Sequence, residues 1–167
     1  QWCQTFTEAS DLGVVQVHLS GGEPLVRNDL PELIRHAREC DLYTNLITSG
    51  TLLNEDKLRE FRDCGLEHIQ LSVQDTDREQ AEIVAGIKSY DKKLEIAGLI
   101  KQLGYPLTIN VVLHNLNIDR VPELITQAAE LGAQRIELAN TQYYAWAFEN
   151  RRALLPPIEK YEHAEAI

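Results

Sequence analysis

The sequence predicts an α/β fold in which parallel strands alternate with helices and curve into an open or partial TIM-like barrel. Three observations support this prediction. Strand-like and helix-like segments alternate about every 30 residues, the spacing of parallel βα units joined by right-handed crossovers. A glycine follows four of the helix-like segments. The strand-like segments alternate between apolar and polar residues instead of being apolar throughout.

Five segments are predicted to be strands because apolar residues recur in them at every second position. They are Val14–Leu19, Tyr43–Thr48, His68–Val73, Leu107–His114 and Arg135–Ala139. In a parallel sheet covered on both faces, the strands would be almost continuously apolar. Here Ile69 and Leu71 alternate with Gln70 and Ser72. We therefore expect one apolar face and one polar face.

The crossover helices are expected to cover the apolar face, so that the polar side chains converge on an inner face. A closed eight-stranded barrel fills its interior with branched apolar side chains. A polar interior therefore favours an open or partial barrel that holds a ligand. The alternative is a one-sided sheet whose polar face lies in solvent.

Six segments have the apolar spacing of helices that lie on a sheet. They are Gln4–Leu12, Leu30–Arg38, Glu55–Asp63, Lys92–Leu103, Val121–Leu131 and Pro157–Ile167. Four of them are expected to end at a glycine that adopts the left-handed conformation. These glycines are Gly13, Gly65, Gly104 and Gly132. The predicted N-caps are Asp29 (in a capping box with Glu32), Asn54 and Asp119.

Composition narrows the classes of function. The 167 residues carry a formal net charge of -10, from 26 acidic and 16 basic side chains. This balance argues against a nucleic-acid-binding surface, and no apolar run is long enough to cross a membrane. Cys3, Cys40 and Cys64 are too far apart for a disulfide framework or a metal site. We expect reduced thiols, no metal ligands within the chain and a cytoplasmic location.

The loop Ser20–Pro24 is the most informative stretch, because it directly follows a predicted strand and precedes a predicted helix. Gly21 and Gly22 let the backbone approach a ligand closely, since neither has a Cβ. Glu23 adds a carboxylate and Pro24 fixes the backbone. Such a loop suits a ligand with an ammonium group. The alternatives are an ordinary strand-to-helix turn or a phosphate-binding loop, although Glu23 would repel a phosphate.

Polar side chains also follow the other predicted strands, at the edge where active sites of βα-barrels lie. They are Thr48, Ser49, Ser72, Gln74, Asp75, Asn110, His114, Asn140, Thr141 and Gln142.

Together these features resemble the radical S-adenosylmethionine (SAM) enzymes, over essentially the whole chain. The resemblance lies in residues 18–25 (HLSGGEPL), 42–50 (LYTNLITSG), 70–75 (QLSVQD), 109–114 (INVVLH) and 137–146 (ELANTQYYAW). The first stretch is typical of the whole superfamily. The last two narrow the resemblance to members that cyclise a small precursor peptide.

The resemblance implies roles for individual residues in binding SAM. Within the loop Ser20–Pro24, residues Gly21, Gly22 and Glu23 would meet the methionyl amine of the cofactor. A second set would lie along its carboxylate and ribose, namely Ser49, Ser72 and Gln74. A third set would reach the ribose and adenine, namely Asn110, His114 and the backbone of residues 138–140. For Ser72, Gln74, Asn110 and His114 the alternative is a buried polar residue whose neighbours satisfy it.

Four residues are candidates for contact with a peptide substrate. Tyr143, Tyr144 and Trp146 follow the last strand, where aromatic rings can grip a peptide. They can equally form a hydrophobic lid or the contact with a neighbouring domain. Asp75 is a candidate substrate contact or general base. It also stands in a turn-prone Asp-Thr-Asp run, and turn formation is the favoured interpretation.

Members of the family bind a [4Fe–4S] cluster through a Cys-x-x-x-Cys-x-x-Cys loop, which this chain lacks. The chain also lacks methionine, and we expect residues 1–167 to be the central part of the barrel, strands two to six. The cluster loop would precede them and a domain with auxiliary clusters would follow. On its own this part is expected to be inactive.

The resemblance implies that the whole protein is an oxidoreductase that joins a glutamate side chain to a tyrosine ring of its precursor peptide. This is the first step towards pyrroloquinoline quinone (PQQ), and a small peptide chaperone presents the substrate. One alternative is a radical SAM enzyme that matures another peptide or protein. Another is a cluster-free scaffold of the same fold.

Overall fold

The computed structural model describes all 167 residues and contains one curved parallel sheet. Its five strands are β1 (Gln16–Leu19), β2 (Tyr43–Thr48), β3 (His68–Ser72), β4 (Leu107–Leu113) and β5 (Arg135–Asn140). Their order in the sheet is β1-β2-β3-β4-β5, and every pair is parallel. The predicted α/β fold, with five parallel strands in chain order, is confirmed.

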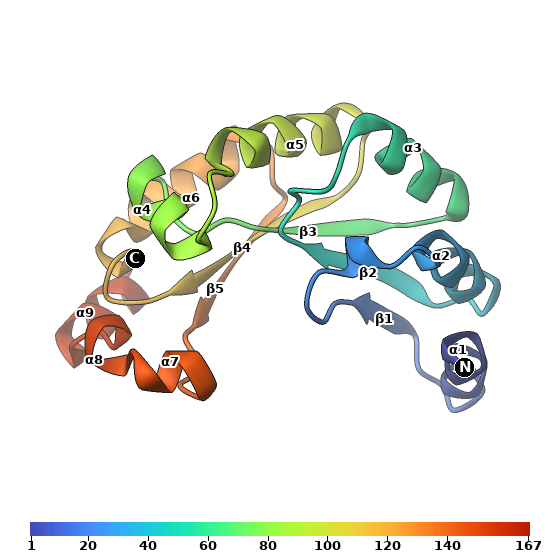
Figure 1. Ribbon diagram of the computed structural model, residues 1–167, viewed down its shortest axis with the longest axis horizontal. Coiled ribbons are helices and arrows are strands. Elements are labelled where there is room, and N and C mark those ends of the chain that lie inside the picture. The colour runs from blue at the N-terminus through green and yellow to red at the C-terminus, as the bar shows by residue number, and fades with distance from the viewer.

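The helices that connect the strands lie on the convex side of the sheet, and its concave side is open (Figure 1). These helices are α2 (Leu30–Glu39), α3 (Glu55–Cys64), α4 (Arg78–Ala85), α5 (Tyr90–Gln102) and α6 (Val121–Glu130). Helix α1 (Trp2–Asp11) precedes β1. The chain ends with α7 (Ala145–Glu149), α8 (Arg151–Leu154) and α9 (Ile158–Glu165). No helix has the length and apolarity that a membrane-spanning segment requires.

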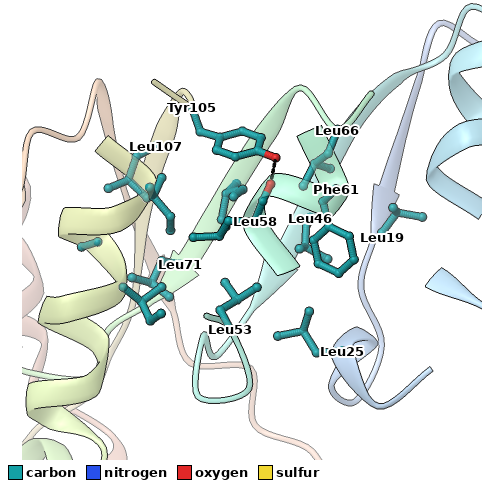
Figure 2. Packing of buried hydrophobic residues seen from close by; sticks show 14 of the residues in the cluster. Leu19, Leu25, Leu46, Leu53, Leu58, Phe61, Leu66, Leu71, Tyr105 and Leu107 are labelled. Atoms are coloured by element: carbon teal, nitrogen blue, oxygen red, sulfur yellow. Dashed lines mark hydrogen bonds between the residues drawn. The ribbon is translucent and has the colours of Figure 1, made fainter. Parts of the chain in front are cut away.

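The main core fills the space between the apolar face of the sheet and the covering helices. Leu46 of β2 and Leu71 of β3 are completely buried, and Leu58 of α3 packs with them in the same cluster (Figure 2). The phenol of Tyr105 lies in this cluster and donates a hydrogen bond of 2.6 Å to the carbonyl oxygen of Leu58. Burial of this face fixes the direction in which every strand side chain points.

The opposite, concave face is polar, as the alternation predicts. On this face His18 is the register partner of Asn45, and Asn45 is the partner of His68. Ser72 is the partner of Asn110 in the same way. Two inward-facing side chains, those of Asn45 and Gln70, are nevertheless more than nine-tenths buried. The curvature of the sheet therefore shelters polar groups that a flat, one-sided sheet would leave in water.

Several details differ from the sequence-based predictions. Helices α7 and α8 and the 3-10 turns η1 (Pro24–Val26) and η2 (Ile118–Arg120) were not predicted, because each is too short to show a periodic apolar pattern. Helix α4 was not predicted either, and it buries one residue only, Ala81. All four predicted terminal glycines have positive φ, as expected. Asn54 caps α3, since its side chain accepts a hydrogen bond from the Lys57 N–H.

Asp29 occupies the predicted N-cap position of α2 but does not form the predicted capping box, and the prediction for Asp119 was wrong. The Asp29 carboxylate binds the guanidinium of Arg27 and makes no capping hydrogen bond. Asp119 lies inside η2, and its carboxylate pairs with Lys160 of α9. In both cases a nearby cation competes with the backbone N–H groups for the carboxylate.

Candidate functional site

The Gly-Gly loop joins the carboxyl end of β1 to η1 and leaves space beside its backbone. Gly21 has φ +130°, a conformation that side-chain-bearing residues rarely adopt. A Cβ on Gly22 would meet no atom within 4 Å, and its φ is ordinary, so the chain itself does not require glycine there. Backbone hydrogen bonds of the loop begin only at Glu23, whose carbonyl accepts from the Val26 N–H. The peptide groups of both glycines are therefore free to meet a ligand.

The Glu23 carboxylate ties this loop to the end of β2. One oxygen accepts hydrogen bonds from the Thr48 hydroxyl (2.7 Å) and from the Leu25 N–H (3.2 Å). The other accepts from the N–H (2.9 Å) and the hydroxyl (2.6 Å) of Ser49. Burial alone would raise the pKa of Glu23, but these hydrogen bonds outweigh it and hold the pKa below its usual value.

These contacts revise two predicted roles. A carboxylate has about four positions for hydrogen-bond donors, and those of Glu23 are filled by the chain. Glu23 therefore positions the glycine backbone and does not offer its side chain to an ammonium group. The hydroxyl of Ser49 donates its hydrogen bond to the same carboxylate, and so it supports the loop from inside the chain. Pro24 is buried and begins η1, whereas Ser20 remains exposed.

A cavity of about 300 Å³ lies at the carboxyl ends of β3 and β4, two strands along the sheet from the loop that follows β1. Nine residues line it: Ser72, Val73, Gln74, Val84, Asn110, Val112, His114, Thr141 and Leu154. Four of the residues predicted to bind the cofactor are thus brought together, from two strands and the loops that follow them. The mixture of hydroxyl, amide and imidazole groups with apolar walls suits a ligand that has both polar edges and a flat apolar body.

Lys93 of α5 fixes the orientation of the Gln74 amide in this cavity. Its ammonium group donates to Oε1 of Gln74 (2.6 Å) and to the carbonyl oxygen of Ser72 (2.8 Å). Since Oε1 is taken, Gln74 presents its amide N–H groups to the cavity. Burial lowers the pKa of Lys93 to about 8, and the Glu23 charge partly opposes this shift.

Sequence analysis did not single out Lys93. Its position carried a signal, because a lysine falls on the buried stripe of α5 that also contains Ile96, Ala97 and Ile100.

His114 is locked in one tautomer. Its Nδ1 accepts a hydrogen bond from the Leu116 N–H (3.2 Å), so the neutral ring carries its proton on Nε2. Burial lowers the pKa of His114, and the nearby Arg120 adds to this effect while Asp75 opposes it. The ring, only 4% exposed, is a neutral hydrogen-bond donor in the cavity wall.

The prediction that Asp75 contacts a substrate was wrong. Asp75 is completely buried, and its carboxylate binds the guanidinium of Arg120 through both oxygens. It also accepts a hydrogen bond of 3.0 Å from the Asp77 N–H, which is the expected turn. Its ion pair joins the loop after β3 to η2.

The three aromatic residues divide into two groups. Tyr143 is half-buried, and its hydroxyl donates to the carbonyl oxygen of Leu154 (3.3 Å). Burial and a hydrogen bond with Tyr161 raise the pKa of Tyr143 to about 12. This residue therefore fixes α8 and α9 to the end of β5. Tyr144 and Trp146 are 70% and 82% exposed, and their contact with a peptide stays a prediction.

The cysteines lie away from these groups. Cys3 is on α1, Cys40 follows α2 and Cys64 ends α3, and all three are free thiols. The guanidinium of Arg35 donates to the Cys64 sulfur at 3.3 Å. The chain contains no group of three side chains that could hold a metal ion.

Comparison with known protein families identifies the superfamily to which the chain belongs. The model of the radical SAM superfamily matches residues 4–128, which is about three quarters of the chain. The chain belongs to the radical SAM superfamily. The matched region includes both the glycine loop and most of the cavity wall.

Curated relatives of this radical SAM chain extend the comparison. The chain is 50% identical over 167 residues to a protein named PqqA peptide cyclase from Granulibacter bethesdensis. The alignment covers 99% of this chain and 45% of that protein. It is 49% identical over 156 residues to the PqqA peptide cyclase of Streptomyces rochei, with 93% of the chain and 43% of that protein covered. The chain thus spans less than half the length of the curated relatives that it matches.

Solved structures confirm the fold of the radical SAM chain. The structure of Streptococcus suis SuiB bound to S-adenosylmethionine matches with a TM-score of 0.81 at 20% identity, over 98% of this chain and 39% of SuiB. SuiB bound to the precursor peptide SuiA matches with a TM-score of 0.76 at 23% identity, over 84% of this chain and 32% of SuiB. The coproporphyrinogen III oxidase HemN of Escherichia coli matches with a TM-score of 0.74 at 18% identity, over 99% of this chain and 42% of HemN.

Proposed function

We propose that this chain is the central part of the catalytic barrel of a PqqA peptide cyclase. The whole protein would join a glutamate side-chain carbon to a tyrosine ring of one precursor peptide, the first step of PQQ biosynthesis. The observation that carries this proposal is the identity of about one half, over nearly the whole chain, to curated proteins of that name. A small precursor peptide and its peptide chaperone would be the partners, in the cytoplasm.

Two features of the site fit SAM. The free peptide groups of Gly21 and Gly22, held in place by Glu23, suit the methionyl amine because carbonyl oxygens accept from an ammonium group. The cavity that begins at Ser72 and Gln74 offers donors for a carboxylate and hydroxyl groups, and apolar walls for a flat base. When bound next to a reduced [4Fe–4S] cluster, SAM supplies a carbon radical that removes hydrogen from an unactivated carbon.

The residues of this chain would contribute binding and orientation. Lys93 would keep the Gln74 amide turned so that its N–H groups face the ligand. His114 would offer one N–H from a ring that stays neutral at pH 7. We propose that the cluster ligands lie outside residues 1–167, since the chain holds no suitable cysteine group.

The proposal is tested with a full-length protein that contains this chain, after reconstitution of its cluster. We expect the precursor peptide to be converted to a product that has lost two hydrogen atoms, with formation of 5′-deoxyadenosine. Formation of 5′-deoxyadenosine without a cross-link in this peptide would instead indicate another peptide substrate. Absence of both products, with SAM bound, would indicate a scaffold of the same fold.

A further inference from the structure

A buried cation of α5, Lys93, has no counter-charge in the chain. It is 5% exposed, lies on the buried stripe of the helix, and forms none of the ion pairs of the protein. Its ammonium group instead donates to two neutral oxygens, Oε1 of Gln74 at 2.6 Å and the carbonyl oxygen of Ser72 at 2.8 Å. Burial of a charge that only neutral groups contact costs free energy, and an anionic ligand group would offset this cost.

The cavity at the carboxyl ends of β3 and β4 contains no cation of its own. Its nine lining residues include neither lysine nor arginine. The His114 ring is neutral, because burial lowers its pKa, and the nearby guanidinium of Arg120 is bound to the Asp75 carboxylate. An anionic ligand group in this cavity would therefore meet hydrogen-bond donors, and the positive charge left to balance it is that of Lys93.

Lys93 lies behind the cavity wall at Gln74. Gln74 and Ser72 are half-buried and line the cavity, whereas Lys93 lines a separate small space with Ser89 and Tyr90. Since Oε1 of Gln74 accepts from Lys93, Nε2 is the end of the amide that can donate to a ligand. A ligand oxygen bound to Nε2 would lie roughly 6 Å from the Lys93 nitrogen, a distance at which opposite charges away from bulk water still attract each other.

We propose that Lys93 is a positioning residue for the carboxylate of SAM: it turns the N–H groups of Gln74 towards that carboxylate and supplies its counter-charge through the amide. This inference rests on the proposed binding of SAM. It assigns recognition of the carboxylate to a residue that does not touch the ligand.

The charge of Glu23 supports this assignment. Like Lys93, Glu23 forms no ion pair, and it lies close enough to act on the pKa of Lys93, which at about 8 leaves the lysine charged at pH 7. The negative charge thus lies at the glycine loop and the positive charge lies behind Gln74. This order matches the ammonium group and the carboxylate of an α-amino acid that extends from the loop to the cavity.

The test compares two ligands of the full-length, cluster-loaded protein by calorimetry: SAM, and decarboxylated SAM, which keeps the amine and the sulfonium. Lys93→Met removes the charge and keeps an unbranched side chain on the buried stripe of α5. We expect the Kd of SAM to rise about tenfold and that of decarboxylated SAM to stay within about threefold of the wild-type value. If Lys93 only supported the packing of α5, both ligands would be weakened by the same factor, and the inference would be wrong.

Two further variants test the location of the charge and its route. Lys101→Met is the matched control, because Lys101 is exposed on the same helix and its loss changes the net charge equally. We expect it to change neither Kd by more than about threefold. Gln74→Met should weaken SAM selectively, and adding Lys93→Met to it should cause little further loss. Losses that multiply in the double variant would show that Lys93 does not act through Gln74, and would overturn the inference.

The outcomes separate the inference from the proposed function. If the wild-type protein binds neither ligand, the proposed cofactor is wrong and the inference falls with it. If the wild-type protein binds SAM and Lys93→Met binds it equally well, the inference alone is wrong. If Lys93→Met does not fold, Lys93→Gln removes the charge while keeping a polar side chain, and the same comparison of the two ligands decides.

Discussion

The hydrogen bonds of the Glu23 carboxylate predict the consequence of replacing it by an amide. In Glu23→Gln one of the two side-chain oxygens becomes an N–H donor. Whichever oxygen is replaced, the new donor faces one backbone N–H, of Leu25 or Ser49, and one hydroxyl. The hydroxyl can rotate to accept, but the backbone N–H cannot. Because the site is partly exposed, we expect a loss of about 2 kcal/mol in the free energy of unfolding, or roughly 4–8 °C in melting temperature.

The effect of Glu23 should depend on pH in a defined direction. Folding lowers the pKa of this carboxyl, so the unfolded chain binds the proton more readily than the folded one. The stabilisation by Glu23 is therefore fully present above its ordinary pKa of 4.5 and is lost as the pH falls through the lower folded value. The difference in unfolding free energy between wild type and Glu23→Gln should shrink over that range.

Urea denaturation of the wild type, of Glu23→Gln and of the control Glu60→Gln measures this. Glu60 lies exposed on α3, so its neutralisation changes the net charge equally without a comparable loss of hydrogen bonds. We expect SAM affinity to fall in Glu23→Gln because the glycine backbone loses its support. If Glu23→Gln were as stable as the wild type but unable to bind SAM, its carboxylate would contact the cofactor directly, and our assignment would be refuted.

Three further substitutions or titrations follow from the site. Asp75→Asn should lower the free energy of unfolding by about 2 kcal/mol, since it removes a buried acceptor and leaves Arg120, whose side chain is 30% exposed, without its counter-charge; a loss of peptide binding at unchanged stability would contradict this. Gly22→Ala should leave the melting temperature unchanged and weaken SAM binding measured by calorimetry, whereas the control Gly98→Ala on α5 should leave binding intact. The ε-amine of Lys93 should titrate near pH 8, against 10.5 for an unperturbed lysine, in carbon NMR of labelled lysines. Because folding lowers this pKa, the contribution of Lys93 to the unfolding free energy should increase as the pH rises between those two values; a titration of Lys93 near pH 10.5 would show that it is not desolvated.

Much of the fold was accessible from the sequence because local pattern and tertiary burial agree. Ile69 and Leu71 alternate with Gln70 and Ser72 on a strand whose two faces differ, and the structure places them as expected. The terminal glycines mark helix ends by a local requirement of the backbone, which does not depend on distant residues.

The parts that failed depend on partners far along the chain. Nothing near Asp75 in sequence shows that Arg120, 45 residues later, will bury its carboxylate. Nor does the Gly-Gly-Glu-Pro motif show that Ser49 and Thr48 will occupy the carboxylate of Glu23. Residue types indicated that a site exists, whereas the division between ligand contacts and internal support required the three-dimensional arrangement.

The strand order also determines how cooperatively the molecule opens. Since each strand pairs only with those next to it in the sequence, the sheet is close to a one-dimensional array of βα modules. Opening can begin at either end and stop between modules, so amide hydrogen exchange should be slowest in β3 and faster towards β1 and β5. The Gly-Gly loop follows β1 at one end of this array, and a ligand that bridges β1 to β4 would couple modules that otherwise open separately.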